Sequence, residues 1–201
     1  MRKKIVITGG LGYIGTELCK LYSGVSWHHE IVVIDNRFIS ERVNQLRNWN
    51  IEFVQGDILD KNLIQKYCND ADVIHHLAGI TQVPRTKRET SKFQDEKIKE
   101  VGTIGTQNIL DVISEKCKII FPSTHVVYEG IEEVKNDIKE DEDTKPVLSY
   151  SSSKATNENQ LKKSGKNFVI LRLGSVYGYS TDTTRIDIMP NLFSKITSQN
   201  G

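Results

Sequence analysis

Short apolar runs alternate along this chain with segments whose apolar residues recur every three or four positions. The runs predict buried strands at residues 5–7, 31–34, 51–55, 73–77, 118–121 and 168–173. The recurring positions predict helices at residues 14–21, 40–48, 92–114, 147–163 and 190–198, with one more after Asp60, its expected N-cap. Because strands and helices alternate throughout, we expect a doubly wound α/β fold, in which helices cover both faces of a parallel sheet.

A glycine-rich turn follows the first predicted strand. Gly9, Gly12 and Gly15 lie between the apolar run and the first helical pattern. Gly9 allows a sharp turn, Gly12 allows the backbone to approach a pyrophosphate, and Gly15 allows the helix to pack on its strand. The free N–H groups at the start of that helix favour phosphate binding. The turn therefore predicts a dinucleotide site.

An acidic residue in the expected place supports this prediction. The second apolar run ends at Asp35, about twenty residues after Gly15, where a carboxylate can accept hydrogen bonds from both hydroxyls of an adenosine ribose. The same carboxylate repels a 2′-phosphate. We therefore predict NAD rather than NADP, and only the nearby Arg37 argues the other way.

The composition excludes several classes of protein. Because 27 Lys and Arg stand against 26 Asp and Glu, the chain has no electrostatic footprint for nucleic acid. The basic clusters at residues 1–4 and 85–88 are short and are interpreted as solvated ends of elements. No apolar segment approaches membrane-spanning length, and the N-terminal basic residues lead directly into the glycine turn rather than into a signal-peptide core. We therefore expect a cytoplasmic protein.

The three cysteines indicate a reducing compartment. Cys19, Cys68 and Cys117 are far apart, and each lies in or beside an apolar pattern. We expect buried free thiols, with neither a disulfide framework nor a metal site.

At 201 residues the chain is long enough for one sizeable α/β domain. We place a dinucleotide-binding domain at residues 1–178 and the start of a second lobe at residues 179–201. The acidic, aperiodic segment at residues 129–146 is interpreted as a solvated surface loop.

Tyr150 and Lys154 are candidate catalytic residues. They stand four positions apart in a helical pattern and so share one helix face. A buried ammonium would favour the phenolate and lower the pKa of the tyrosine from its usual value near 10. Such a pair also occurs by chance on exposed helices. It becomes informative here because a dinucleotide fingerprint precedes it.

Thr124 follows the fifth predicted strand, where its hydroxyl could share a proton with a substrate oxygen. The alternative is that it caps a turn or helix beside Pro122. His125 is adjacent, but an isolated histidine at a strand end is more often structural, and His75 and His76 are interpreted in the same way, as parts of the fourth strand.

These features fall in the order seen in the extended short-chain dehydrogenases/reductases, which the chain resembles from Arg2 to about Gly178. The motifs that carry the likeness are TGGLGYIG (8–15), Asp35, GDI (56–58), HLAG (76–79), Thr124, YSSSK (150–154), LR (171–172) and VYG (176–178). The chain is most similar to the NAD-dependent nucleotide-sugar epimerase/dehydratase branch, and to the UDP-glucose 4-epimerase type in particular. The resemblance implies a Rossmann fold and a tightly held NAD.

The resemblance also implies roles for the matching positions. For the cofactor these are Gly9, Gly12, Tyr13 and Ile14 at the pyrophosphate, Asp35 and Asn36 at the adenosine ribose, Asp57 and Ile58 at the adenine, and Leu77, Ala78 and Gly79 beside the nicotinamide. Thr124, Tyr150 and Lys154 match the catalytic Ser/Thr, Tyr and Lys of the family. Lys154 would also hold the nicotinamide ribose, next to Tyr150.

Four positions depart from the family pattern. Gly102 stands where the long helix of the family usually has Asn, and Ser175 replaces an Asn that contacts the sugar nucleotide. The 4,6-dehydratases usually have Asp-Glu after the catalytic Thr, whereas this chain has His125 and Val126, which argues against a dehydratase. Members of this branch also carry a C-terminal lobe that closes over the sugar nucleotide, and this chain ends before most of it.

Three functions remain open from the sequence. The first is an epimerase that acts on a nucleotide sugar through a transient 4-keto intermediate. The second is a nucleotide-sugar dehydratase or reductase, and the third is a non-catalytic NAD-binding module. Pairing of chains through a helix bundle is common in the family, so the helices near Lys92 and Val147 are candidates for a homodimer interface.

Overall fold

The centre of the molecule is a six-stranded, fully parallel sheet with the order β3-β2-β1-β4-β5-β6. The computed structural model describes residues 1–81, 91–182 and 185–200. The strands are β1 (Lys4–Thr8), β2 (Glu30–Asp35), β3 (Glu52–Gln55), β4 (Val73–His76), β5 (Lys118–Thr124) and β6 (Asn167–Leu173). The chain runs outward from β1 to β3 and then returns to β4 on the other side of β1. Ligands of such sheets bind beyond the carboxyl ends of the strands at this reversal.

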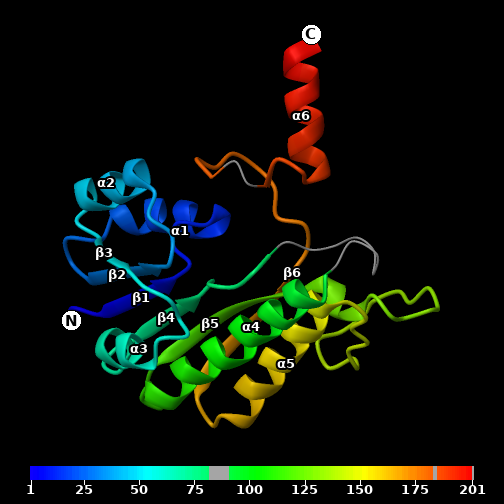
Figure 1. The fold of residues 1–201 in the computed structure, drawn as a ribbon, viewed down its shortest axis with the longest axis horizontal. Helices are drawn as coiled ribbons and strands as arrows, with labels where there is room; N and C mark the ends of the chain where they lie inside the picture. The colour runs from blue at the N-terminus through cyan, green and yellow to red at the C-terminus, as the bar shows by residue number, and fades with distance from the viewer. Residues whose placement is uncertain (82–90, 183–184, 201) are drawn as a thin grey trace.

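Helices cover the two faces of the sheet unequally (Figure 1). The first face carries α1 (Tyr13–Ser23) and α2 (Ser40–Asn48), and the second carries α3 (Lys61–Cys68), α4 (Lys92–Val112) and α5 (Ser149–Lys163). Successive strand residues alternate between two cores: the first contains Ile5, Ile7, Ile31 and Val33, and the second contains Val6, Val32, Ile34 and Ile74. Each fully buried side chain of this size contributes about 1.5–3 kcal/mol to stability.

Helix α4 is continuous through its two glycines because other side chains occupy the space of their missing Cβ atoms. A Cβ on Gly102 would lie 2.1 Å from Ser153 Oγ of α5, and a Cβ on Gly105 would lie 2.2 Å from Ile58 Cδ1. The glycines thus let α4 approach α5 and the loop after β3.

The structure confirms the expected Rossmann fold and most element boundaries. Helix α2 has the predicted bounds, and the Asp60 carboxylate caps α3 by accepting hydrogen bonds from the amides of Asn62 and Leu63. Strand β5 continues three residues further than predicted, through Pro122 to Thr124, because its pairing with β6 continues to Leu173. Helix α5 begins at residue 149 rather than 147. The basic residues 85–88 lie outside the described residues.

All three cysteines are free and buried, as the sequence predicted. Burial raises the pKa of the Cys19 and Cys68 thiols to about 12 and that of Cys117 to about 11, so each stays protonated at neutral pH. Among the described residues, no helix is both long and apolar enough to cross a membrane.

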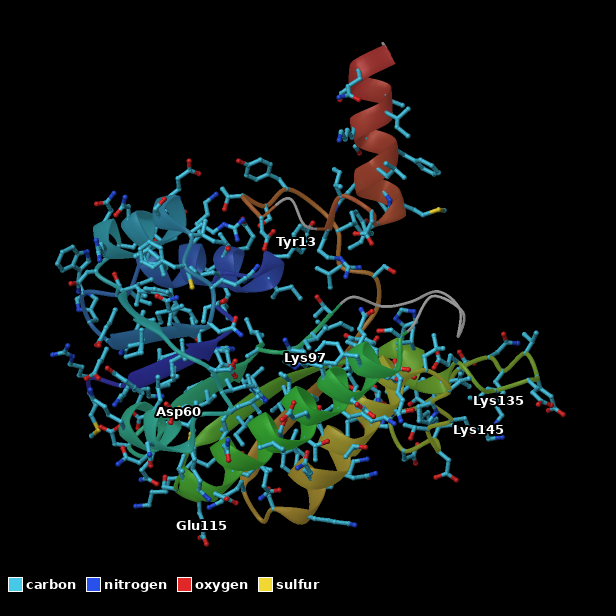
Figure 2. All side chains as sticks on the ribbon, in the orientation of Figure 1. Tyr13, Asp60, Lys97, Glu115, Lys135 and Lys145 are labelled. Carbon is cyan, nitrogen blue, oxygen red and sulfur yellow. The ribbon has the colours of Figure 1, made fainter. Side chains whose placement is uncertain are left out.

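After β6 the chain returns to the glycine turn. Tyr13 at the start of α1 donates a hydrogen bond of 2.5 Å to the carbonyl of Gly178, and Figure 2 shows Tyr13 close to this returning segment. The last helix, α6 (Met189–Asn200), extends away from the sheet (Figure 1). Its residues Met189 and Phe193 are 62% and 56% exposed.

Candidate active site

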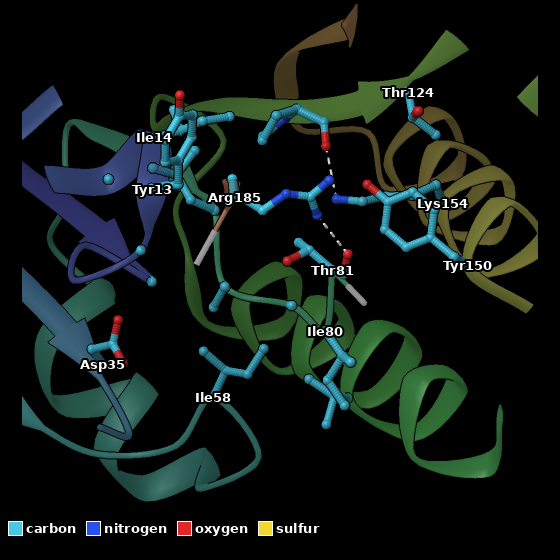
Figure 3. Close-up of a pocket in the computed structure, with 18 of the residues that line it drawn as sticks. Tyr13, Ile14, Asp35, Ile58, Ile80, Thr81, Thr124, Tyr150, Lys154 and Arg185 are labelled. Atoms are coloured by element: carbon cyan, nitrogen blue, oxygen red, sulfur yellow. Dashed lines mark hydrogen bonds between the residues drawn. The ribbon is translucent and has the colours of Figure 1, made fainter. Parts of the chain in front are cut away.

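A cleft of about 1070 Å³ lies at the carboxyl ends of the strands, next to the reversal at β1. Every site residue predicted from the sequence lines it: Gly9, Gly12, Tyr13, Ile14, Asp35, Asn36, Asp57, Ile58, Leu77, Ala78, Gly79, Thr124, Tyr150 and Lys154. Figure 3 shows the two ends of this cleft, with Asp35 and Ile58 on one side and Thr124, Tyr150 and Lys154 on the other. The folded chain thus brings together residues up to 145 positions apart.

The glycine turn has the geometry that a diphosphate requires. Gly9 has a φ of +71°, and a Cβ there would lie 2.7 Å from the amide nitrogen of Ala78. A Cβ on Gly15 would lie 2.4 Å from the carbonyl oxygen of Gly9, so Gly15 packs on the turn rather than on the strand. Gly12 is the N-cap of α1 and has no side chain to occupy the first free amides of the helix. These amides therefore fit the pyrophosphate of a dinucleotide.

At the adenosine end of the cleft, the Asp35 carboxylate already accepts several hydrogen bonds. It accepts hydrogen bonds from the backbone amides of Leu11 and Arg37, both at 3.0 Å, and from Arg37 Nε at 3.2 Å. Asp35 is only 5% exposed. Its expected bonds to the ribose hydroxyls remain a prediction, and they require the Arg37 side chain to move.

The residues predicted at the adenine form a rigid edge of the cleft. Asn36 Nδ2 donates to Asp57 Oδ2 at 3.1 Å, and Asp57 Oδ1 accepts from the amide of Leu59 at 3.0 Å. Ile58 is 4% exposed and packs against Gly105. This pairing joins the ends of β2 and β3 below the ribose position.

A buried chain of hydroxyl and imidazole groups fixes the strand end predicted beside the nicotinamide. His76 lies 2.9 Å from Thr8 Oγ1 through Nδ1 and 3.0 Å from Thr106 Oγ1 through Nε2. Thr8 Oγ1 also accepts a hydrogen bond from the amide of Ala78 at 3.2 Å. Burial, and secondarily the charge of Lys154, lowers the pKa of His76 to about 3, so its ring is neutral. The sequence-based interpretation of His76 as a structural residue of the fourth strand agrees with this position.

Lys154 is held at the base of the catalytic end. Its Nζ donates to the carbonyl of Pro122 at 2.7 Å and lies 4.4 Å from the centre of the Phe121 ring. Burial lowers the pKa of Lys154 to about 8, while Glu158, one turn further along α5, acts to raise it. Lys154 therefore remains largely protonated at neutral pH.

Tyr150 lies beside Lys154, with its ring centre 6.0 Å from Nζ. The sequence predicted that Lys154 would lower the pKa of Tyr150, and this is wrong for the structure described here. Burial raises the pKa of Tyr150 above its usual value, and the cation that opposes this effect is Arg185. Lys154 Nζ donates its hydrogen bond to the Pro122 carbonyl rather than to Tyr150.

Thr124 ends β5 and caps the short 3₁₀ helix η2 (His125–Tyr128), where its Oγ1 accepts a hydrogen bond from the amide of Val126 at 3.3 Å. The capping role considered from the sequence is therefore present. It leaves the hydroxyl proton of Thr124 available for another acceptor, so capping and a role in the cleft are compatible. His125 is exposed, and its Nδ1 lies 3.1 Å from the carbonyl of Leu173.

Arg185 reaches into the catalytic end from the C-terminal segment. Its Nη1 donates to the carbonyl of Thr81 at 3.0 Å, and its Nε lies 3.4 Å from Asp187. Figure 3 shows its guanidinium between Thr81 and the Tyr150–Lys154 pair. Arg185 is therefore the cation at this end whose charge opposes the effect of burial on the pKa of Tyr150.

A buried ion pair between Glu158 and Arg172 stabilises the catalytic end of the cleft. Glu158 accepts hydrogen bonds from Ser123 Oγ at 2.5 Å and from Arg172 Nη2 at 2.7 Å, and it is 2% exposed. Ser123 precedes Thr124, so Glu158 ties the end of β5 to the helix that carries Tyr150 and Lys154. The pKa of the Glu158 carboxyl lies below its usual value because the hydrogen bonds from Arg172 and Ser123 outweigh burial, which acts to raise it.

Sequence reasoning did not find Asp182, Arg185 or the Ser123–Glu158–Arg172 cluster. These side chains contact partners that are 14 to 140 positions away, as in the pairs Arg172–Glu158 and Arg42–Asp182. Such contacts leave no spacing pattern along the chain. The buried Arg-Glu pair had one signal: a charged residue one helical turn after Lys154, on the same face.

Comparisons with known proteins agree with this geometry. The family model described as the NAD dependent epimerase/dehydratase family matches residues 5–200. The chain is 31% identical over 202 residues to a CDP-paratose 2-epimerase of Salmonella typhi, an alignment that covers 87% of this chain and 58% of the relative. It is 29% identical over 197 residues to a dTDP-D-glucose 4,6-dehydratase of Dictyostelium discoideum, covering 88% of this chain and 44% of the relative. The chain therefore spans about half the length of these relatives.

Solved structures of epimerases are also similar to this chain. A UDP-N-acetylglucosamine 4-epimerase from Methanobrevibacter ruminantium M1, in complex with UDP-N-acetylmuramic acid, superposes with a TM-score of 0.78 at 25% identity, covering 98% of this chain and 64% of that chain. A UDP-glucuronic acid 4-epimerase from Bacillus cereus, in complex with NAD, superposes with a TM-score of 0.76 at 26% identity, covering 98% of this chain and 63% of that chain. The similar proteins include epimerases and a dehydratase, so similarity at this level does not distinguish these reactions.

Proposed function

The chain belongs to the NAD-dependent epimerase/dehydratase family, and we propose that it forms the NAD-binding and catalytic part of an enzyme that inverts a nucleotide-linked sugar through a transient 4-keto intermediate. The family is NAD-dependent, and the glycine turn beside Asp35 fits that cofactor. The nucleotide sugar comes from the similar proteins, which act on UDP-, CDP- and dTDP-sugars by name.

NAD in this cleft would accept a hydride from the sugar C4 and return it. The residues of the chain divide the remaining work by their position. Gly9, Gly12 and the first amides of α1 would hold the pyrophosphate, and Asp35 would hold the adenosine ribose. The Leu77–Gly79 backbone, fixed by Thr8 and His76, would line the nicotinamide.

Tyr150 would act as the general base for the sugar 4-hydroxyl. With the sugar bound, its phenolate takes that proton while the C4–H bond breaks, and the tyrosine hydroxyl returns the proton when the bond forms again on the other face. Burial alone opposes the phenolate, so the base form depends on the nearby charge of Arg185 and on the positive charge of oxidised nicotinamide. Thr124 would donate its hydroxyl proton to the same sugar oxygen.

One observation carries this proposal. Thr124, Tyr150 and Lys154 share a single cleft with the glycine turn and Asp35, although nothing in the fold alone requires a Thr-Tyr-Lys set there. A protein that only binds a dinucleotide has no need of these three side chains. His125 and Val126 follow Thr124 in this chain, where the dehydratases have an Asp-Glu pair. This difference supports epimerisation over dehydration.

Replacement of Tyr150 by Phe tests the proposal. The variant is expected to bind NAD with unchanged affinity, measured by calorimetry, and to form no epimerised sugar when UDP-, CDP- or dTDP-hexoses are added. Tyr67→Phe is the matched control, because Tyr67 packs against the second core, away from the cleft. Formation of the epimerised sugar by the Tyr150 variant would reject the catalytic assignment. A wild-type chain that binds NAD but oxidises none of these sugars would leave only the binding function, and product analysis separates epimerisation from dehydration.

A further inference from the structure

Arg37 stands between two buried carboxylates. Its Nε lies 3.2 Å from Asp35 Oδ1 and its Nη2 lies 3.5 Å from Asp35 Oδ2, while its Nη1 lies 3.9 Å from Asp182 Oδ2. Asp35 and Asp182 are 5% and 1% exposed, so water screens neither carboxylate well. The guanidinium is thus shared between them, with Asp35 as its nearer partner.

The Arg37 side chain also covers the position that the site assigns to the adenosine ribose. Its Nη2 would lie only 3.7 Å from a Cβ on Gly12, so it reaches from Asp35 to the glycine turn. The amides of Leu11 and Arg37 already occupy two acceptor positions of the Asp35 carboxylate. A ribose diol that donates to Asp35 needs the positions that Arg37 Nε and Nη2 now fill. Ribose binding and the present Arg37–Asp35 contact therefore exclude each other.

Asp182 ends a segment, residues 178–182, that we call the strap. The strap is fastened to the glycine turn, since Gly178 accepts a hydrogen bond from Tyr13 Oη and Ser180 Oγ donates to the Tyr13 carbonyl at 3.2 Å. Arg42 of α2 adds an ion pair of 3.2 Å to Asp182 and a hydrogen bond of 3.3 Å to the Thr181 carbonyl. The second carboxylate next to Arg37 thus belongs to the segment that closes over the turn.

We propose that Arg37 is a positioning residue that couples the adenosine-ribose subsite to the strap: a ribose diol bound at Asp35 displaces Arg37 onto Asp182, which holds the strap more firmly on the glycine turn. The ligand class is a nucleotide with a free 2′,3′-diol at this end, so the inference rests on the proposed NAD site. Asp182 provides a second carboxylate, which the displaced Arg37 guanidinium can reach by a short movement. Without it, ribose binding would leave the guanidinium, whose side chain is 43% exposed, with water in place of an anionic partner.

The coupling extends from the adenosine end of the cleft toward the catalytic end. The strap is followed by Arg185, whose charge acts on Tyr150 at the catalytic end. Because coupling between two sites is reciprocal, a firmly held strap raises nucleotide affinity as much as the nucleotide stabilises the strap. Arg37 thereby links recognition of the adenosine half of the cofactor to the segment that leads into the catalytic end.

A double-mutant cycle on NAD affinity tests the proposal, with the full chain, Arg37→Gln, Asp182→Asn and the double variant compared by calorimetry. Asp182→Asn is expected to weaken NAD binding by about 5- to 10-fold in the wild-type background, a typical size for coupled sites. In the Arg37→Gln background the same change is expected to weaken binding less than in wild type, since no cation is displaced and only the Arg42–Asp182 ion pair is lost. Arg37→Gln alone is expected to bind NAD at least as tightly as wild type, because it removes a competitor of the ribose.

Ser180→Ala is the matched control, because it loosens the strap on Tyr13 without changing any charge. Its effect on NAD affinity is expected to be equal in both backgrounds. An equal loss from Asp182→Asn in both backgrounds would overturn the coupling, and so would no loss in either, which would mean that Arg37 moves elsewhere, for example to the pyrophosphate. Absence of NAD binding by the wild-type chain would overturn the proposed function as well.

Amide hydrogen exchange gives a second measurement that does not depend on the Asp182 variant folding. ADP-ribose, which contains the adenosine diol and no nicotinamide, is expected to slow exchange in residues 178–182 of the wild-type chain. The same ligand is expected to have no such effect in Arg37→Gln. Equal protection in both proteins would contradict the proposal.

Discussion

At the scale of single residues, His76 shows how the site uses a titratable group without its charge. The ring is enclosed by Thr8 and Thr106, and both of its nitrogens lie within hydrogen-bond distance of their hydroxyl oxygens. A neutral imidazole can donate from one nitrogen and accept at the other, as this place requires. Protonation would add a charge in a fully enclosed position near Lys154.

This position predicts a pH dependence of stability. The pKa of His76 is about 3 in the folded chain against 6.5 in the unfolded chain, so the unfolded state takes up a proton first as the pH falls. The free energy of unfolding is therefore expected to fall below pH 6.5 by about 1.4 kcal/mol per pH unit from this group. In His76→Gln, denaturant unfolding at a series of pH values should show a shallower decline. An unchanged slope would mean that His76 is not protected from protonation.

Glu158 carries a second prediction at this scale. Replacing it by Gln removes the anion from a buried pair and leaves Arg172, which is 12% exposed, without its counter-charge. We expect a loss of about 3 kcal/mol in the free energy of unfolding. The same change should lower the pKa of Lys154 further below about 8, since Glu158 is the group that raises it. Both are measured directly, by denaturant unfolding and by NMR titration of the lysine.

Lys162→Ala supplies the control for Glu158. Lys162 faces the same carboxylate at 4.0 Å but is 52% exposed, so its removal is expected to change stability by less than about 0.5 kcal/mol. The stabilisation by Glu158 is present above pH 4.5 and is lost as the pH falls through its lowered pKa. A loss in Glu158→Gln no larger than in Lys162→Ala would show that the buried pair contributes little.

At the scale of elements, the contact between α4 and α5 depends on Ser153 of α5, which packs against Gly102 of α4. Ser153 Oγ occupies the space where Gly102 lacks a Cβ. Gly102→Ala is expected to destabilise the chain by about 1–3 kcal/mol through overpacking, despite the better helix propensity of Ala. Because Ser153 Cβ would remain 3.6 Å away, the double variant Gly102→Ala/Ser153→Ala should recover most of that loss. Thermal or denaturant unfolding of the single and double variants decides this, and strictly additive losses would contradict it.

The periodic patterns predicted the elements well because each pattern reflects burial on one face. The limits of that approach appear at α5, which begins two residues later than the pattern indicated. Glu129 Oε1 accepts hydrogen bonds from the amides of Val147 and Leu148, at 2.8 and 2.7 Å, and from Ser151 Oγ. This cap comes from the acidic segment interpreted as a solvated loop, 18 or more residues earlier. Capping by a distant side chain has no local sequence signal.

The candidate site likewise contains features that the sequence predicted and features that it did not. Residues whose role follows from backbone position, such as Gly9 with its positive φ and Asp35 at a strand end, were predicted from spacing. The state of their side chains was not. The contact of Arg37 with Asp35, two residues away, depends on a side-chain conformation that spacing does not reveal. The effect of Arg185 on Tyr150 depends on where residues beyond 178 return to the cleft.

At the scale of the whole molecule, the two cores and the C-terminal segment are separable. Both cores consist of residues between positions 5 and 170, so no residue after β6 belongs to either. On the face of the sheet that carries α1 and α2, the buried strand residues of the core come from β1 and β2, and Leu171 of β6 is 41% exposed. The stability of the sheet therefore comes from the part of the chain that precedes the strap.

A chain that ends at Gly178 is accordingly expected to fold and to unfold in one cooperative transition, as the predicted domain boundary requires. It loses the Asp182 ion pairs and the Ser180–Tyr13 hydrogen bond, contacts that lie outside both hydrophobic cores, so its free energy of unfolding should fall by no more than about 2 kcal/mol. A chain that ends at Lys166 is the control, because it also lacks β6 and exposes the partner edge of β5. Denaturant unfolding followed by circular dichroism compares the three chains. If the 178-residue chain unfolds without a cooperative transition, the segment after β6 is part of the folding unit and the boundary at 178 is wrong.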